Sequence, residues 1–144
     1  MIFGSNMWFA EEIDIKASSA RVFRLYADVA GWPTWDPDVE SSSIEGKFQA
    51  GATGELKPKR GPKSAITITE VVSDRSFTAE SRLPFCVMRF EHELRSDAGY
   101  TKAVHRVSFE GPLAFLFGRL IGPSIRKGLP QTLRGLKQAA ERQS

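Results

Sequence analysis

The stretch FCVMRFEHELRSDAGYTKAVHRVSFE, residues 85–110, contains the pattern that decides the fold. Apolar and polar residues alternate on both sides of a turn signal, Asp-Ala-Gly at residues 97–99. This alternation predicts two antiparallel strands, at 85–95 and 100–110, joined as a hairpin. One face of the first strand carries Cys86, Met88, Phe90, His92 and Leu94, and one face of the second carries Thr101, Ala103, His105, Val107 and Phe109. We expect this largely apolar face to line the protein interior.

The segment before this hairpin predicts four more short strands. They are expected at residues 39–45, 53–57, 64–72 and 76–82, with Gly, Pro, Ser and Asp residues marking the turns between them. The connections are too short to hold crossover helices, so the sheet is expected to be an antiparallel meander.

The first forty residues predict one further strand followed by a short helical pair. Residues 8–15 form the strand, and Ser18 is expected to cap a helix whose apolar positions recur at helical spacing. This helix should end by residues 31–33 (Gly-Trp-Pro), because proline disfavours helical geometry in the residue before it. A short helical turn or loop is expected at 34–37.

After Pro112 the apolar residues recur every three or four positions, which predicts one long amphipathic helix of about thirty residues. Pro112 suits the first helical position. Pro123 is expected to break the helix or to begin a new first turn, and Pro130 to kink it. Two interpretations remain open: a bent helix that fills the core, or one whose small residues leave space above the sheet. The apolar stripe comprises Leu113, Phe117, Ile121, Ile125, Leu129, Leu133, Leu136 and Ala140.

Several motifs carry a resemblance to a known family. They are Asp28-x-x-x-Trp32-x-x-Trp35-x-Pro37, Gly51-x-x-Gly54, His105-Arg-Val-x-Phe-x-Gly111-Pro-Leu-Ala and Leu129-Pro-x-x-Leu133-x-x-Leu136-Lys137. Over nearly its whole length the chain resembles the polyketide cyclase/dehydrase branch of the START-like (SRPBCC) superfamily. The resemblance implies an α+β helix-grip fold, in which a seven-stranded antiparallel curved sheet surrounds the carboxy-terminal helix and leaves a deep apolar ligand cavity. Members include lipid and sterol carriers, plant hormone-binding proteins and aromatase/cyclases.

The composition agrees with a single START-like domain over residues 1–144. The chain is 41% hydrophobic and 26% charged with a net charge of +3, which excludes a disordered chain and a dedicated nucleic-acid binder. No apolar run reaches the roughly 18–20 residues of a membrane helix, and no basic residue precedes the apolar residues of the amino terminus. The single cysteine, Cys86, forbids an intramolecular disulfide. We expect a cytoplasmic protein, either a monomer or a homodimer.

Few residues are capable of acid–base chemistry. His92 and His105 share the inward face of neighbouring strands, as direct or diagonal neighbours, and are the candidate catalytic residues. Alternatively, each imidazole bonds to a local backbone or hydroxyl partner within the core. Cys86 would lie about 20 Å from His92 at roughly 3.3 Å per residue, so it is interpreted as a buried, inert thiol. No metal-ligand spacing or cofactor motif is present, so neither is expected.

Our first hypothesis is a protein that binds or carries a small hydrophobic molecule in the cavity that the resemblance implies. Trp32 and Trp35 are expected to line this cavity; the alternative interpretation is that they only pack against the sheet edge. A second hypothesis is a cyclase or dehydratase with His92 or His105 as general base. The residues expected to line the cavity are Trp32, Trp35, Met88, Phe90, His92, His105, Val107, Phe109, Ile125, Leu129 and Leu133.

A third hypothesis is a membrane-associated interaction module that uses the basic carboxy-terminal helix. Residues 112–144 contain Glu141 as their one acidic residue against Arg119, Arg126, Lys127, Arg134, Lys137 and Arg142. A second basic group, Lys57, Lys59, Arg60 and Lys63, surrounds the turn at 58–62. Such residues attract anionic ligands or anionic lipid, but they are also common on solvated helices and loops.

Overall fold

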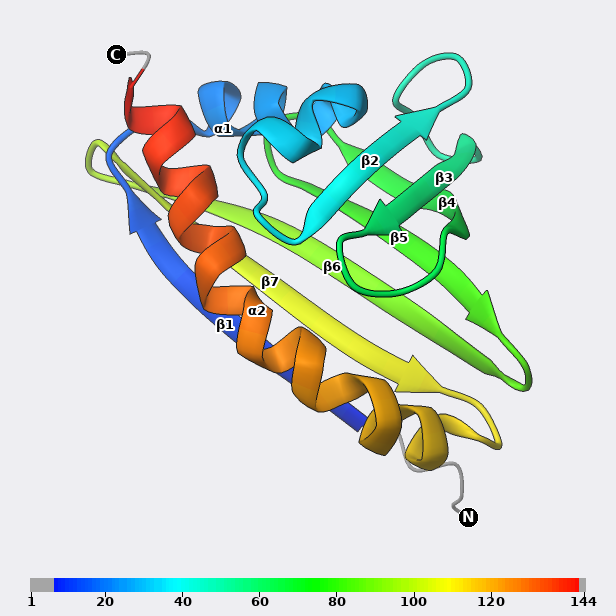
Figure 1. Cartoon of the computed structure of the whole chain (residues 1–144). Coiled ribbons are helices and arrows are strands. Elements are labelled where there is room, and N and C mark those ends of the chain that lie inside the picture. The colour runs from blue at the N-terminus through cyan, green and yellow to red at the C-terminus, as the bar shows by residue number, and fades with distance from the viewer. Residues whose placement is uncertain (1–6, 143–144) are drawn as a thin grey trace.

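Seven strands form one antiparallel sheet in the computed structural model, which describes residues 7–142 (Figure 1). The sheet order is β1-β7-β6-β5-β4-β3-β2, so every neighbouring pair except β1 and β7 is also consecutive in the chain. This is the curved meander and long helix expected of a helix-grip fold. The strands are β1 (Met7–Ile15), β2 (Val39–Ile44), β3 (Thr53–Pro58), β4 (Ser64–Val72), β5 (Ser76–Leu83), β6 (Cys86–Asp97) and β7 (Tyr100–Glu110).

The helical pair after β1 comprises α1 (Ser19–Ala27) and a 3-10 helix, η1 (Val29–Thr34). Ser18 caps α1 as predicted, because its side chain accepts a hydrogen bond from the Arg21 amide at 3.2 Å. After Thr34 the segment at 34–37 is a loop, one of the two predicted alternatives, and the helical turn precedes it at η1. The Trp32 indole explains this placement, because it donates to the carbonyl of Tyr26 at 3.0 Å and ties η1 back to α1.

The hairpin of β5 and β6 differs from the prediction at its turn. Phe85, predicted to begin a strand, instead occupies the turn with a φ of 55°. Pro84 and Phe85 are the only residues between the two strands, and such a tight connection requires a left-handed residue. Strand β6 therefore begins at Cys86 and continues to Asp97.

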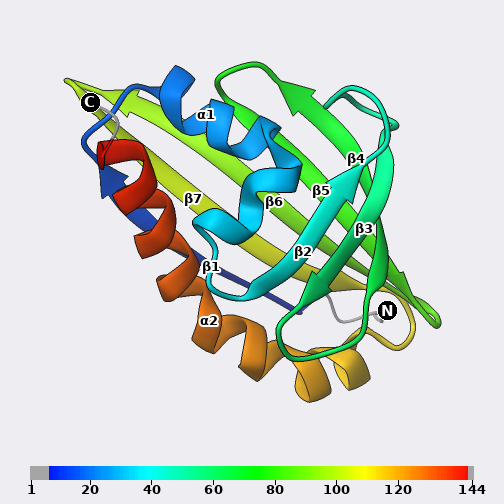
Figure 2. The same cartoon turned by 45° about the horizontal axis from the view of Figure 1, so that its top comes forward.

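The carboxy-terminal helix α2 (Ala114–Arg142) runs without interruption, so the break predicted at Pro123 is wrong. A proline removes one hydrogen bond, and Pro123 is exposed, where water can replace that bond. The helix also begins at Ala114 rather than at Pro112, which lies in the preceding turn. Figures 1 and 2 show α2 lying along β1 and β7. No helix within residues 7–142 is long and apolar enough to span a bilayer.

The apolar interior divides into two clusters along α2. The first cluster lies against α1 and η1 and includes the carboxy-terminal half of the α2 stripe, where Leu133, Leu136 and Ala140 are buried. The second lies under the amino-terminal half of α2 and contains buried Cys86, Val107, Phe109, Ala114 and Leu129. Its remaining members are only partly buried: Phe9, Leu83, Met88, Phe90, Phe117, Ile121 and Ile125.

Candidate functional site

Two histidines face each other at the centre of the sheet. The antiparallel register of β6 and β7 pairs His92 directly with His105, as one of the two predicted arrangements requires. Their ring centroids lie 4.5 Å apart, with the planes at 71°. His105 is buried, at 4% exposure. Alternation along the two strands is therefore sufficient to place both imidazoles together.

Each imidazole has a partner inside the protein. The Tyr26 hydroxyl lies 2.7 Å from Nε2 of His105, and Nδ1 of His92 lies 3.2 Å from the carbonyl oxygen of Phe77. The Phe77 ring also stacks on His92, with centroids 3.9 Å apart and planes at 7°. The geometry thus matches the alternative in which each histidine satisfies a local hydroxyl or backbone group.

Burial keeps this cluster uncharged. It lowers the pKa of His92 to about 4 and, together with the neighbouring His92, holds the pKa of His105 well below its usual range. Burial also raises the pKa of Tyr26 above its usual range, so the phenol keeps its proton. Within residues 7–142 the phenol has no other hydrogen-bond acceptor than His105, and we infer that it donates to Nε2.

The proton positions follow from these partners. A carbonyl oxygen only accepts, so His92 carries its proton on Nδ1 and presents Nε2 as an acceptor. His105 accepts from Tyr26 through its own Nε2. The backbone partners of His92, at Phe77 and Phe90, are carbonyl acceptors. Within residues 7–142 no donor is found on its Nε2, which is therefore left to accept from a further hydrogen-bond donor.

The histidine pair lies at the border between the two apolar clusters. On the inward face of β6, Phe90 precedes His92 and belongs to the second cluster, and Leu94 follows it and belongs to the first. The structure brings six of the predicted lining residues together in the second cluster: Met88, Phe90, Val107, Phe109, Ile125 and Leu129. It places the other three apolar ones, Trp32, Trp35 and Leu133, in the first cluster.

Several residues of this region were not among the predicted site residues. Tyr26 and Phe77, which bond to the histidines, are more than a dozen positions away from them in sequence. Phe117 and Ile121 were on the predicted apolar stripe and could have been included from their spacing with Ile125. The structure also leaves the buried indole Nε1 of Trp35 without a hydrogen-bond partner among the described residues. No sequence pattern indicates that last feature.

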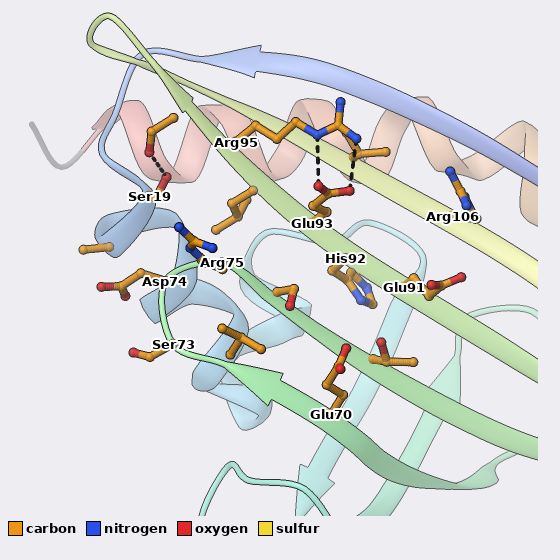
Figure 3. A pocket seen from close by; sticks show the side chains of 17 residues that line it. Ser19, Glu70, Ser73, Asp74, Arg75, Glu91, His92, Glu93, Arg95 and Arg106 are labelled. Atoms are coloured by element: carbon orange, nitrogen blue, oxygen red, sulfur yellow. Dashed lines mark hydrogen bonds and ion pairs between the residues drawn. The ribbon is translucent and has the colours of Figure 1, made fainter.

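Each of the two hollows described in the structure includes one predicted lining residue, His92 or Trp35, but neither lies between α2 and the inward face of β6 and β7. One, of about 320 Å³, lies between residues 33–37 and the last turns of α2. The other, of about 1010 Å³, lies over the outward side chains of β5, β6 and β7 and reaches the start of α1 (Figure 3). Its charges have both signs, which is typical of a solvated surface. The charged residues are Glu70, Asp74, Arg75, Glu91, Glu93, Arg95 and Arg106.

Cys86 lies at the first position of β6, remote from the histidines along the strand. The thiol is buried, and burial raises its pKa. Among the described residues, no group of three or more His, Cys, Asp and Glu side chains is placed to hold a metal ion. The site is thus a partly exposed apolar cluster beside α2 with a neutral, hydrogen-bonded histidine pair at one end.

Comparison with known proteins identifies the family. Residues 8–141 match the family model described as polyketide cyclase / dehydrase and lipid transport. No protein of curated function matches the sequence significantly.

Solved structures share the fold at low sequence identity. TTHA0849 from Thermus thermophilus is 18% identical with a TM-score of 0.76, over 96% of this chain and 99% of that one. Zhui aromatase/cyclase from Streptomyces sp. R1128 is 18% identical with a TM-score of 0.77, over 96% and 95% of the two chains. A norcoclaurine synthase from Thalictrum flavum is 11% identical with a TM-score of 0.76, over 100% of both. With the family model covering nearly every described residue, the chain belongs to the polyketide cyclase/dehydrase and lipid transport family of the START-like (SRPBCC) superfamily.

Proposed function

We propose that the protein binds a small hydrophobic molecule between the first half of α2 and the inward face of β6 and β7. One observation carries this proposal. Inward-facing apolar side chains from both elements remain partly exposed there, among them Met88, Phe90, Ile121 and Ile125, whereas most apolar members of the first cluster are buried. Large apolar groups that face one another yet stay accessible favour an apolar guest.

The polar end of the guest is expected to carry a hydrogen-bond donor. The recess ends at the histidine pair, where His105 already accepts from Tyr26. Nε2 of His92 is the acceptor that remains, and a few such polar groups orient ligands in apolar pockets. A hydroxyl or amine at one end of an otherwise apolar molecule has the matching chemistry.

Binding is favoured over catalysis by the state of the histidines. A general base works best when its pKa lies near the working pH. His92, with a pKa of about 4, is a weak base at neutral pH. Nε2 of His105 is already hydrogen-bonded to the hydroxyl of Tyr26. The cyclase hypothesis therefore has less support from this geometry, although the family includes cyclases by its description.

The test uses a filled recess and a matched control. Met88→Trp adds volume on the inward face of β6, whereas Val87→Trp places the same side chain on the outward face at the adjacent position. The probe is 1-aminoanthracene, an apolar fluorophore with one amine. We expect it to bind the wild type and Val87→Trp, and to lose at least about tenfold in affinity for Met88→Trp, since a filled pocket removes apolar contacts.

A second comparison needs no substitution. The N,N-dimethyl derivative of the probe lacks the N–H donor, so it should bind the wild type about two- to tenfold more weakly than the amine itself. Equal loss of binding in both tryptophan variants, or no binding by the wild type, would refute the proposed recess. Consumption of an added apolar substrate, abolished in His92→Phe, would instead establish the enzymatic alternative.

A further inference from the structure

Exposed apolar side chains gather where the β5–β6 turn meets the start of α2. The Phe85 ring is 75% exposed, and Leu120 is 68% exposed. Phe115 and Leu116, in the first turn of the same helix, are 49% and 40% exposed. We refer to these four residues as the apolar end. Single exposed apolar residues are ordinary, but a group of large ones marks an interaction surface.

The two segments that carry these four residues are joined. The amide of Leu113 donates to the carbonyl of Phe85 at 3.1 Å, which joins the β5–β6 turn to the segment that leads into α2. Leu116 and Leu120 are four residues apart and lie on one face of the helix. Both views of the fold show this turn beside the first turns of α2 (Figures 1 and 2).

Folding does not explain the residue at the turn. Phe85 has a φ of 55°, a conformation that favours glycine or asparagine and is rare for a bulky side chain. Its ring gains little from burial, because three quarters of it is exposed. A strained and exposed aromatic residue points to a function for the side chain itself.

The basic residues of α2 indicate which kind of partner would bind the apolar end. From Ala114 to Ala140 the helix has no acidic residue, and it carries Arg119, Arg126, Lys127, Arg134 and Lys137. Arg119 and Lys127 are exposed on the side of the helix that carries Leu116 and Leu120. Apolar side chains flanked by basic ones fit an anionic lipid surface, whereas a second copy of the chain would present the same positive charge.

We propose that the apolar end is a docking surface for anionic membranes. Phe85, Phe115, Leu116 and Leu120 enter the boundary between headgroups and acyl chains, and Arg119 and Lys127 contact the anionic headgroups. The surface does not require that a ligand occupy the interior recess, so the two proposals can fail separately.

The test measures sedimentation with vesicles of phosphatidylcholine containing one third phosphatidylglycerol, against vesicles of phosphatidylcholine alone. We expect wild-type protein to sediment with the anionic vesicles at low salt and to be released at about 0.5 M salt, where exposed charges are screened. Phe85→Ser with Leu120→Ser should abolish binding. The matched control is Tyr100→Ser, which removes a 49% exposed aromatic ring beside the β6–β7 turn at the other end of β6.

Two double substitutions of basic residues distinguish binding through this surface from a general electrostatic attraction between the protein and the vesicle. Arg119→Gln with Lys127→Gln should lower affinity for the anionic vesicles by roughly tenfold or more. Lys59→Gln with Arg60→Gln removes the same charge from the β3–β4 turn and should have little effect. Because all of these side chains are exposed, thermal unfolding should show that each variant remains folded.

Three results would overturn the proposal: no binding by the wild type to the anionic vesicles, equal loss in the Tyr100 control, or loss caused by the Lys59 and Arg60 variant instead. A concentration-dependent dimer that Phe85→Ser with Leu120→Ser dissociates, without vesicle binding, would assign the apolar end to self-association. The binding of 1-aminoanthracene, measured without vesicles on the same variants, should be unchanged. That measurement distinguishes failure of membrane docking from failure of the interior recess.

Discussion

Mild acid should destabilise this protein through its two histidines. His105 is buried and His92 is partly buried, and both are neutral, with the pKa of His92 lowered to about 4 and that of His105 held well below its usual range. The unfolded chain takes up protons on both as the pH falls below about 6.5, while the folded chain does not. The two histidines therefore cost no stability above pH 6.5, and the free energy of unfolding decreases as the pH falls from 6.5 toward 4.

The size of the effect follows from the pKa values. At pH 5, an unfolded pKa of about 6.5 against a folded pKa of about 4 costs about 2 kcal/mol for His92. His105 adds a further cost of the same sign, because its pKa is also held well below its usual range in the folded protein. The cost of about 2 kcal/mol from His92 alone is a sizeable part of the roughly 5–15 kcal/mol that stabilises a typical domain.

Urea unfolding at pH 7 and pH 5 measures this loss. The chain has two histidines in all, so no other side chain has its ordinary pKa in this interval. The midpoint should fall by at least about 1 M urea for a slope of about 2 kcal/mol per molar. Asp36 acts in the opposite direction, because burial raises its pKa, and Asp36→Asn is the variant that isolates the histidines. A change below about 1 kcal/mol would refute the buried, neutral histidine pair.

Three further outcomes test the packing around the site. Gly135→Ala should destabilise the protein by about 2 kcal/mol or more, because its Cβ would overlap a backbone carbonyl after η1, whereas Gly122→Ala meets only ordinary contacts and should be neutral or stabilising by up to about 1 kcal/mol. Equal urea midpoints for the two alanine variants would contradict this close approach. Tyr26→Phe should cost about 1–3 kcal/mol, since it leaves Nε2 of His105 buried without its donor, and a midpoint equal to that of the wild type would show that the bond contributes nothing. Cys86 should react with a thiol reagent only as fast as the protein opens, because it is buried with a raised pKa; rapid labelling of the folded protein would exclude that position.

The sheet and the pairing of its histidines could be predicted because both depend on local pattern. Alternation through residues 85–110 assigns His92 and His105 to one face, and the short turn between the strands limits the register to a narrow choice. The carboxy-terminal apolar stripe likewise predicts which side of α2 is buried. These features follow from the spacing of apolar residues along the chain and from its turn residues.

Contacts that join distant segments could not be predicted in this way. Tyr26 meets His105 across 79 positions of sequence, so no spacing rule connects them. The continuity of α2 through Pro123 also depends on context, because tertiary packing offsets the intrinsic cost of proline. The strained turn at Phe85 follows from the two-residue connection between β5 and β6, whose length the alternation alone does not define.

The most direct test of the proposed recess is a methyl NMR titration of the wild-type protein with 1-aminoanthracene. The account predicts that the largest shifts occur at Met88, Ile121 and Ile125, which face one another between β6 and α2. The methyl groups of Ile66 and Ile68, buried in the first cluster, should move little. Shifts confined to Val72 and Val104, which border the outward hollow, would contradict the account and place the bound molecule on the opposite face of the sheet.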